Sequence, residues 1–212
     1  MALEVFDYRT DQRNVLITPA IRARFEYLAP GTVGVRHNHD VGTEIWLVLQ
    51  GRIEFEVEDE RAVLEPGKLI FARPGQKHSV RVLGDEPVIQ YLSVTPHIRP
   101  IANFYRDGVE VHSGYRRLAE ERDAGPSMAV PEWIDRHLAE VSALEGAVAE
   151  AVQEHETLEE DLRAAHSDKD GEKAKEVLDA LWPKIRSLSH QYFKMVESWN
   201  GLTGQITEVD HV

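Results

Sequence analysis

The chain has 212 residues, of which 42% are hydrophobic and 29% charged, an ordinary composition for a globular protein of one or two domains. Acidic residues outnumber basic ones by 37 to 24 and the net charge is -13, so we expect neither nucleic acid nor an anionic membrane as a partner. The chain has no cysteine, which excludes disulfides and thiolate metal sites.

The first residues, MALEVFDYRTDQRNVLI, do not show the basic start and apolar run of a signal peptide. No stretch approaches the roughly 18 apolar residues of a membrane-spanning helix. We therefore expect a cytoplasmic protein.

Residues 1–100 read as a series of short strands of roughly 4–8 residues, many of them separated by glycine, proline or acidic residues. Alternation is clearest at 52–58, where Ile53, Phe55 and Val57 point to one face and charged residues to the other. No helix-length pattern interrupts these strands. The sequence therefore predicts a mainly β fold, an antiparallel sandwich or small barrel.

Residues 101–130 show less regular patterning and are predicted to be a connector. We expect this segment to wrap the edge of the barrel. The alternative is a lid over the pocket, with Tyr105 or Arg106 reaching inward.

Residues 131–205 are predicted to form an α-helical hairpin. Apolar residues recur every three or four positions from 134 to 165 and again from 174 to 199, and the polar segment SDKDGE lies between them. Two helices alone make a poor core, so the apolar stripes should pack on the barrel or on another subunit. We expect a homodimer in which two hairpins form a four-helix bundle, with an intramolecular cap as the alternative.

Three features suggest where these helices begin and end. Pro131 suits a first helical turn. Pro183 lies inside the second apolar stripe and should kink the helix or end it there. Asn200 and Gly201 are a plausible stop.

Two blocks, 31–51 and 67–78, contain the residues that we interpret as one metal site. Two histidines in alternation share one face of a strand, and a turn with Asp40 and Gly42 lets the next strand direct a carboxylate back toward them. A third histidine follows a Pro-Gly turn in a later strand. The predicted ligands are His37, His39, Glu44 and His78.

Three imidazoles and one carboxylate suit one divalent transition metal: iron, manganese, nickel, cobalt, copper or zinc. We favour iron or manganese. Calcium would require mostly oxygen ligands. Four protein ligands on a six-coordinate ion leave two positions for water, substrate or dioxygen, whereas zinc could leave the site closed.

These blocks resemble the two motifs of the cupin superfamily, in particular of the small single-barrel cupins. Every position of the first motif matches, and in the second motif Arg73 occupies the proline position and Val82 the asparagine position. The resemblance covers about residues 15–96 and implies a jelly-roll barrel (a double-stranded β-helix) of six to eight strands, with the same four ligands. The matching residues are Gly31, His37, His39, Glu44, Gly51, Gly67, Gly75 and His78.

Strand alternation from the ligands predicts an apolar pocket, which favours a small, mostly hydrophobic or aromatic ligand that chelates the metal through its oxygens. For the last strand of the barrel, alternation leaves open whether Gln90 and Leu92 or their neighbours face inward. The predicted pocket lining is Val35, Trp46, Val48, Val80 and Val82.

The resemblance implies a metal-dependent enzyme that acts on a small organic molecule, with a dioxygenase or another oxidoreductase as the leading expectation. Glu44 is the candidate catalytic residue, either as a plain ligand or as a base. Two alternatives stay open: a non-catalytic metabolite-binding or sensor module, and a metal-dependent isomerase or epimerase. The latter should carry further acid–base groups in its pocket.

Overall fold

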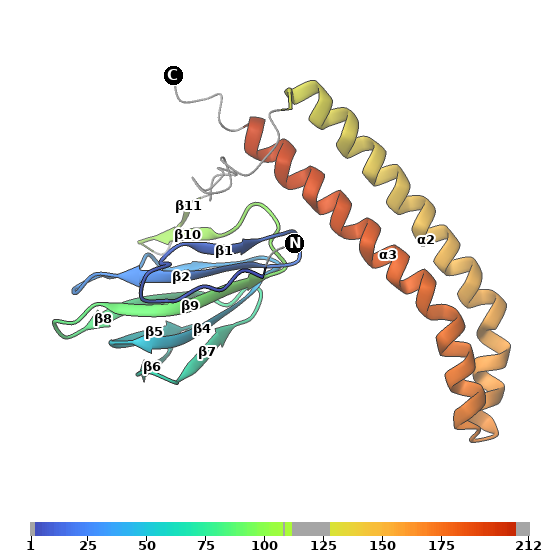
Figure 1. Ribbon diagram of the computed structural model, residues 1–212, viewed down its shortest axis with the longest axis horizontal. Helices are drawn as coiled ribbons and strands as arrows, with labels where there is room; N and C mark the ends of the chain where they lie inside the picture. Colours follow the sequence, from blue (N-terminus) through green and yellow to red (C-terminus); the bar gives the residue numbers. More distant parts are fainter. Residues whose placement is uncertain (1–2, 108, 112–127, 207–212) are drawn as a thin grey trace. The chain divides into compact units, whose positions relative to one another are not determined.

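The computed structural model describes residues 3–107, 109–111 and 128–206. The chain divides into two compact units, one of residues 1–126 with 203–212 and one of residues 127–202. The first unit consists of strands, and two long helices form the second (Figure 1). The mainly β fold followed by a helical hairpin is therefore confirmed.

The strands form two antiparallel sheets. The described part of the chain holds more strands than the six to eight expected: β1 to β9 lie before the connector predicted at 101–130, and the connector contributes β10 and β11. The five-stranded sheet has the order β1 (Asn14–Ile17), β2 (Arg22–Leu28), β9 (Val88–Thr95), β4 (Thr43–Gln50) and β7 (Leu69–Ala72). The six-stranded sheet has the order β11 (Val109–Val111), β10 (Asn103–Arg106), β3 (His37–Asn38), β8 (His78–Leu83), β5 (Arg52–Val57) and β6 (Glu60–Leu64).

Both sheets contribute side chains to one hydrophobic core. Ile53 and Phe55 of β5 are completely buried, as their alternation with charged residues predicts, and Trp46 and Val48 of β4 join them. Gly51 makes the tight turn between these strands with a φ of 78°, and a Cβ there would lie 2.5 Å from the carbonyl oxygen of Pro87. Only glycine fits this turn, which connects a strand of one sheet to a strand of the other.

The segment after β9 adds strands to the edge of the six-stranded sheet. β10 pairs with β3, and Phe104 lies opposite His37. Tyr105 directs its hydroxyl to Oδ1 of Asn38 at 3.4 Å, so it does not reach into the barrel. Residues 112–127 of the predicted connector lie outside the described residues.

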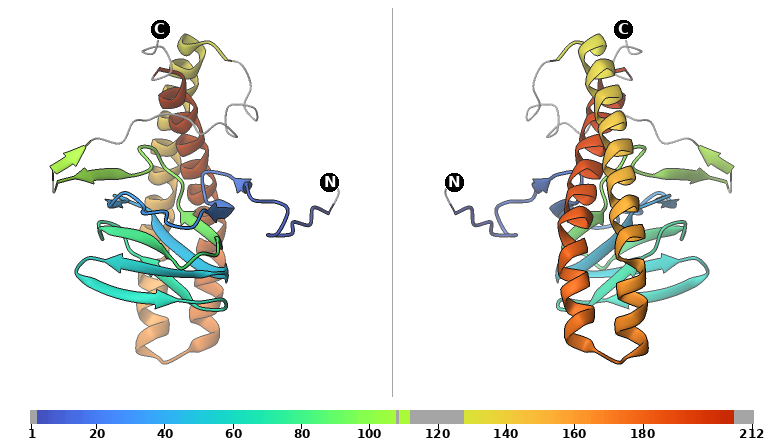
Figure 2. Two further views of the ribbon diagram at one scale, coloured as in Figure 1. Left: turned by 90° about the vertical axis from the view of Figure 1, so that its left-hand side faces the viewer. Right: turned by 90° about the vertical axis from the view of Figure 1, so that its right-hand side faces the viewer.

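The second unit is a hairpin of α2 (Val130–Ser167) and α3 (Gly171–Ile206), which run antiparallel and side by side (Figures 1 and 2). Pro131 lies in the first turn of α2, as predicted, and Glu132 accepts a hydrogen bond from the backbone N–H of Ala129 at 3.0 Å. Polar pairs join the two helices along their length: Arg136 with Glu197, His137 with Ser198, Gln191 with Glu140, and Lys184 with Glu150.

α3 continues through Pro183, so of the two outcomes expected there, a kink or an end, the end is excluded. α3 also does not stop at Gly201. A Cβ at Gly201 would lie 2.3 Å from the ring of Trp133, so this glycine makes room for a tryptophan of α2.

Neither described helix has a stretch that is both apolar enough and long enough to span a bilayer. The expected homodimer stays a prediction.

Candidate metal centre

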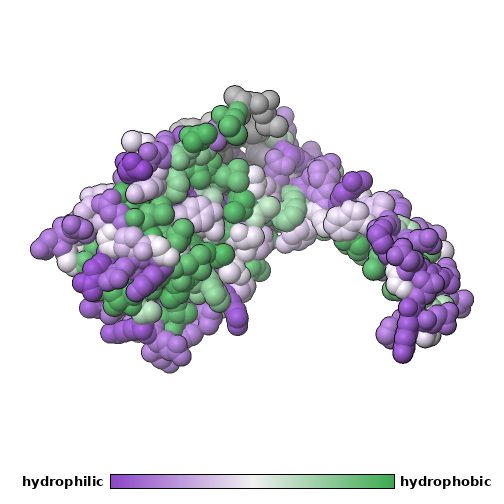
Figure 3. Space-filling view, turned by 60° about the horizontal axis from the view of Figure 1, so that its bottom comes forward, coloured by the Kyte–Doolittle hydropathy of each residue, from purple (hydrophilic) through white to green (hydrophobic). Residues whose placement is uncertain are grey.

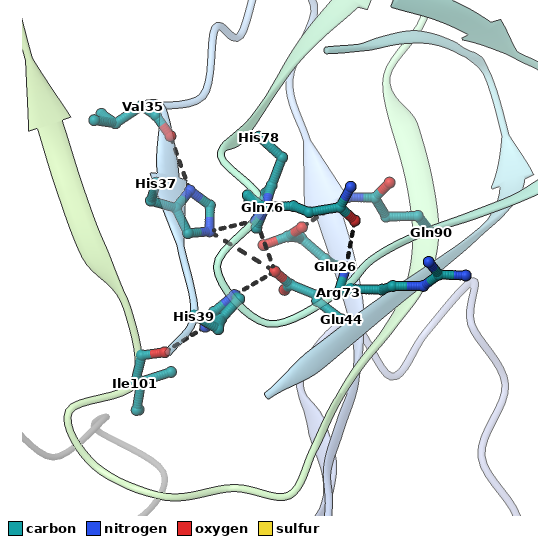
Figure 4. Close-up of polar contacts among 10 residues, drawn as sticks. All are labelled: Glu26, Val35, His37, His39, Glu44, Arg73, Gln76, His78, Gln90 and Ile101. Carbon is teal, nitrogen blue, oxygen red and sulfur yellow. Dashed lines mark hydrogen bonds and ion pairs between the residues drawn. The ribbon is translucent and has the colours of Figure 1, made fainter. Parts of the chain in front are cut away.

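Four side chains from three strands and one loop meet at one place in the barrel. β3 supplies His37, the loop after it His39, β4 Glu44, and the first residue of β8 is His78. His37 and His78 are register partners on the neighbouring strands β3 and β8. One potential ligand atom of each residue lies within 4.8 Å of those of the other three, so the structure brings the four predicted residues together (Figure 4).

The Glu44 carboxylate lies at the centre of this cluster. Its Oε2 atom is 2.5 Å from Nε2 of His39, 3.1 Å from Nε2 of His78 and 3.8 Å from Nε2 of His37. The Nε2 atoms of His37 and His78 are 3.1 Å apart. Glu44, His39 and His78 are almost completely buried, whereas His37 is partly exposed.

The opposite nitrogen of each imidazole fixes the orientation of its ring. Each Nδ1 atom faces a backbone carbonyl oxygen, which can only accept, so Nδ1 carries the proton of a neutral ring and Nε2 keeps its lone pair. The carbonyl partners are Val35 for His37 at 2.9 Å, Gln76 for His78 at 2.9 Å, and Ile101 for His39.

Three lone pairs and one carboxylate therefore converge with no hydrogen-bond donor among them. Such a group of acceptors is unfavourable inside a protein unless a cation or a proton lies between them. Neutral imidazoles and a carboxylate are ligands that divalent transition metals prefer. The donor set thus fits the metal that the sequence predicts.

The electrostatics of the cluster keep the carboxylate ionised. Burial alone would raise the pKa of Glu44, but the three histidines beside it hold that pKa well below its ordinary value of 4.5. Burial opposes a charge on His37, yet the Glu44 carboxylate outweighs burial and raises the pKa of His37 above 6.5. Burial lowers the pKa of His78.

A cavity of about 410 Å³ opens onto the four residues. Among the residues predicted to line it, Val35, Trp46 and Val80 do so. The structure places Val48 and Val82 in the core instead, because the barrel narrows to packed side chains there.

The cavity is more polar than expected. Gln90 and Leu92 face inward, which resolves the alternation that the sequence left open. β2 adds Arg22, Arg24 and Glu26 to a lining that is otherwise mainly apolar, as expected. Sequence reasoning missed these residues because charged positions that alternate with Ala23, Phe25 and Tyr27 suggest a solvent-facing edge.

The segment after β9 also contributes to the site. Ile101, Ala102 and Phe104 line the cavity, and the ring of Phe104 packs against that of His37 with centroids 5.4 Å apart. The carbonyl of Ile101 holds His39. No motif marks these residues, since their role depends on the pairing of β10 with β3.

The family model of the Cupin domain matches residues 24–95 of this chain. Residues 24–95 are a cupin domain. The match contains the four clustered residues. It does not contain Ile101, whose carbonyl bonds to His39, or the helical hairpin. It is shorter at its start than the resemblance to residues 15–96 suggested.

Some solved structures are similar to part of this chain. A double-stranded β-helix protein from Klebsiella pneumoniae is 23% identical, covers 50% of this chain and 100% of its own, and has a TM-score of 0.46. KdgF from a Halomonas species is 28% identical, with 45% and 78% covered and a TM-score of 0.37. A Cupin 2 conserved barrel domain protein from Salinispora arenicola is 22% identical, with 45% and 88% covered and a TM-score of 0.38. No curated protein matches the chain.

Proposed function

We propose that the cupin domain binds one divalent transition metal, with iron or manganese favoured, and acts on a small organic molecule as an oxygenase-type oxidoreductase. The observation that carries this proposal is the convergence of three Nε2 lone pairs and the Glu44 carboxylate at the cavity. The ligands are His37, His39, Glu44 and His78.

The metal would supply Lewis-acid chemistry and, as iron or manganese, redox chemistry with dioxygen. The protein contributes orientation, because the backbone carbonyls fix the three imidazole rings. Trp46, Val80 and Phe104 line the cavity with apolar surface, which limits water near the reacting molecule. The close contacts of Glu44 with His39 and His78 both involve Oε2, so Oε1 is the candidate base for a proton of the substrate.

Two measurements test this proposal. Elemental analysis of the purified protein should find about one transition metal per chain, and oxygen uptake should require iron(II) and one member of a panel of small oxygen-bearing molecules. Both should be lost in His78→Ala and kept in Val82→Asn, which alters a core position that does not ligate. A wild-type metal content in His78→Ala would contradict the site, and metal-loaded protein that consumes no oxygen with any molecule would contradict the oxygenase.

A metal-dependent isomerase or epimerase is the second candidate. The inward-facing Glu26 favours it, because such reactions move protons and this pocket holds more ionisable groups than the sequence indicated. An isomerase would convert its substrate to a product of the same formula without oxygen uptake. Mass spectrometry of the product therefore separates the two candidates.

A further inference from the structure

One face of β2 carries charged residues into the cavity. Arg22, Arg24 and Glu26 alternate along the strand and all line the same cavity as the metal cluster. Charged side chains on the inward face of a barrel strand are costly unless they have partners. The partners of Arg24 and Glu26 therefore decide what these two side chains can bind.

The register places these charges in the same sheet as Glu44, two strands away from it. On the three adjacent strands β2, β9 and β4, Arg22 aligns with Val94 and Glu44, and Arg24 with Leu92 and Trp46. Two strand spacings separate β2 from β4, about 10 Å between backbones. A molecule of a few carbon atoms can thus extend from the metal cluster to a guanidinium group.

Arg24 keeps hydrogen-bonding capacity for such a molecule. Its Nη2 atom is 3.0 Å from Oε1 of Glu26, which is its one polar partner among the described residues, although a guanidinium offers five donors. Oε2 of Glu26 accepts a hydrogen bond from Nε2 of Gln90 at 2.8 Å. Gln90 is completely buried, and its Oε1 atom has no hydrogen-bond partner in the described part of the chain.

The charges of the cavity favour an anion. Arg24 balances Glu26, Glu44 carries one negative charge, and the histidines must be neutral to bind a metal. A divalent ion then leaves these groups with a net charge of about +1 in a cavity of low dielectric constant. An anionic ligand would offset this charge, whereas a neutral ligand would not.

We propose that the cavity binds a small organic acid whose carboxylate pairs with Arg24 while its other oxygen-bearing end faces the metal cluster. This inference rests on the proposed metal-binding function. Glu26 and Gln90 hold the guanidinium in place, and Arg24 selects the substrate. Because a planar guanidinium matches a carboxylate in two parallel hydrogen bonds, it distinguishes acids from amides of the same shape.

Calorimetric titration of manganese-loaded protein tests this inference. The ligands are straight-chain dicarboxylates, from malonate to adipate, and their diamides. At least one dicarboxylate should bind about tenfold or more tightly than its diamide, in line with a hydrogen-bonded charge pair. Arg24→Gln should remove this preference, and Glu26→Gln, which deletes a competing carboxylate, should increase it. Arg81→Gln is the matched control, because Arg81 has an exposed side chain and its loss changes the net charge equally.

Manganese content, measured first on every variant, keeps the two proposals distinguishable. Protein that binds manganese but not dicarboxylates, or binds them no more tightly than diamides, would overturn the organic-acid inference alone. The organic-acid inference would also be overturned if Arg24→Gln kept the preference for dicarboxylates over diamides. So would a result in which Arg24→Gln and Glu26→Gln lower stability without opposite effects on dicarboxylate binding. Wild-type protein that binds no metal would overturn the proposed function and this inference with it.

Discussion

The barrel and the hairpin bury their apolar residues to very different degrees. In the barrel, Ile53, Phe55, Val48 and Val88 are completely buried in one core. In the hairpin, Leu138 keeps 62% of its surface exposed, and Figure 3 shows apolar side chains along the edge of a mainly hydrophilic hairpin. The two helices also leave between them an apolar groove of about 500 Å³. The barrel can therefore hold a rigid site, whereas the hairpin has apolar surface left to bury.

Metal content should show the largest contrast between the two regions. His78→Ala removes a ligand and should lower metal affinity by more than the roughly 10–100-fold cost of losing a partner that only orients a ligand. His155→Ala in α2 should leave the metal content unchanged, since His155 is not in the metal cluster and its ring bonds to the carbonyl of Ala151. Elemental analysis after dialysis measures both, and equal losses in the two variants would remove the distinction.

The second-largest contrast between the barrel and the hairpin should be in the free energy of unfolding of their variants. Phe55→Ala leaves a cavity in the barrel core and should lower the free energy of unfolding by about 3–5 kcal/mol. Leu138→Ala alters an exposed position of the hairpin and should change it by less than about 0.5 kcal/mol if the hairpin stays unpartnered. Urea denaturation of the full chain gives both values. A larger loss for Leu138→Ala, together with a smaller apparent mass by light scattering, would support the homodimer expected from the sequence.

Within the hairpin, two glycines should respond in opposite directions. A Cβ at Gly201 meets the Trp133 ring, so Gly201→Ala should destabilise the hairpin by about 1–3 kcal/mol despite the better helix propensity of alanine. Nothing lies within 4 Å of a Cβ at Gly146, so Gly146→Ala should stabilise it by up to about 1 kcal/mol. Thermal unfolding followed by helical circular dichroism tests this pair, and effects of the same sign would contradict the packing of Trp133 on Gly201.

Acidification should act on the barrel site first. A protonated imidazole cannot bind a metal, so affinity falls as pH falls, by about tenfold per pH unit for each proton that competes. The raised pKa of His37 places the start of this loss above the ordinary histidine value of 6.5, while the lowered pKa of Glu44 keeps its carboxylate ionised. Metal titration at several pH values measures the loss, and a constant affinity down to about pH 5 would argue against histidine ligands.

The sequence predicts most strongly what depends on short spacing. The alternation of His37 and His39, with Glu44 after a turn, depends on neighbouring residues, and these three converge with His78 as expected. The inward direction of Arg24 depends instead on how β2 pairs with β9, which no local pattern encodes. A charged strand face usually faces solvent, but the charged face of β2 lines the cavity instead.

Two residues of the hairpin show the limit of helix propensity. Pro183 and Gly201 usually interrupt helices, and both lie inside α3. At Gly201 the absence of a side chain makes room for the ring of Trp133, 68 positions away in the sequence. Propensity describes one helix at a time, whereas tertiary packing decides whether the helix continues.

The bond from His39 to the carbonyl of Ile101 has a practical consequence for dividing this protein. A fragment that ended at residue 95, where the family match ends, would keep every predicted ligand but lose the acceptor that sets the tautomer of His39. It would also lose β10, which covers β3 beside His37. Such a fragment would be a poor substitute for the intact barrel, and separate expression of the metal-binding part should retain the chain through Arg106 at least.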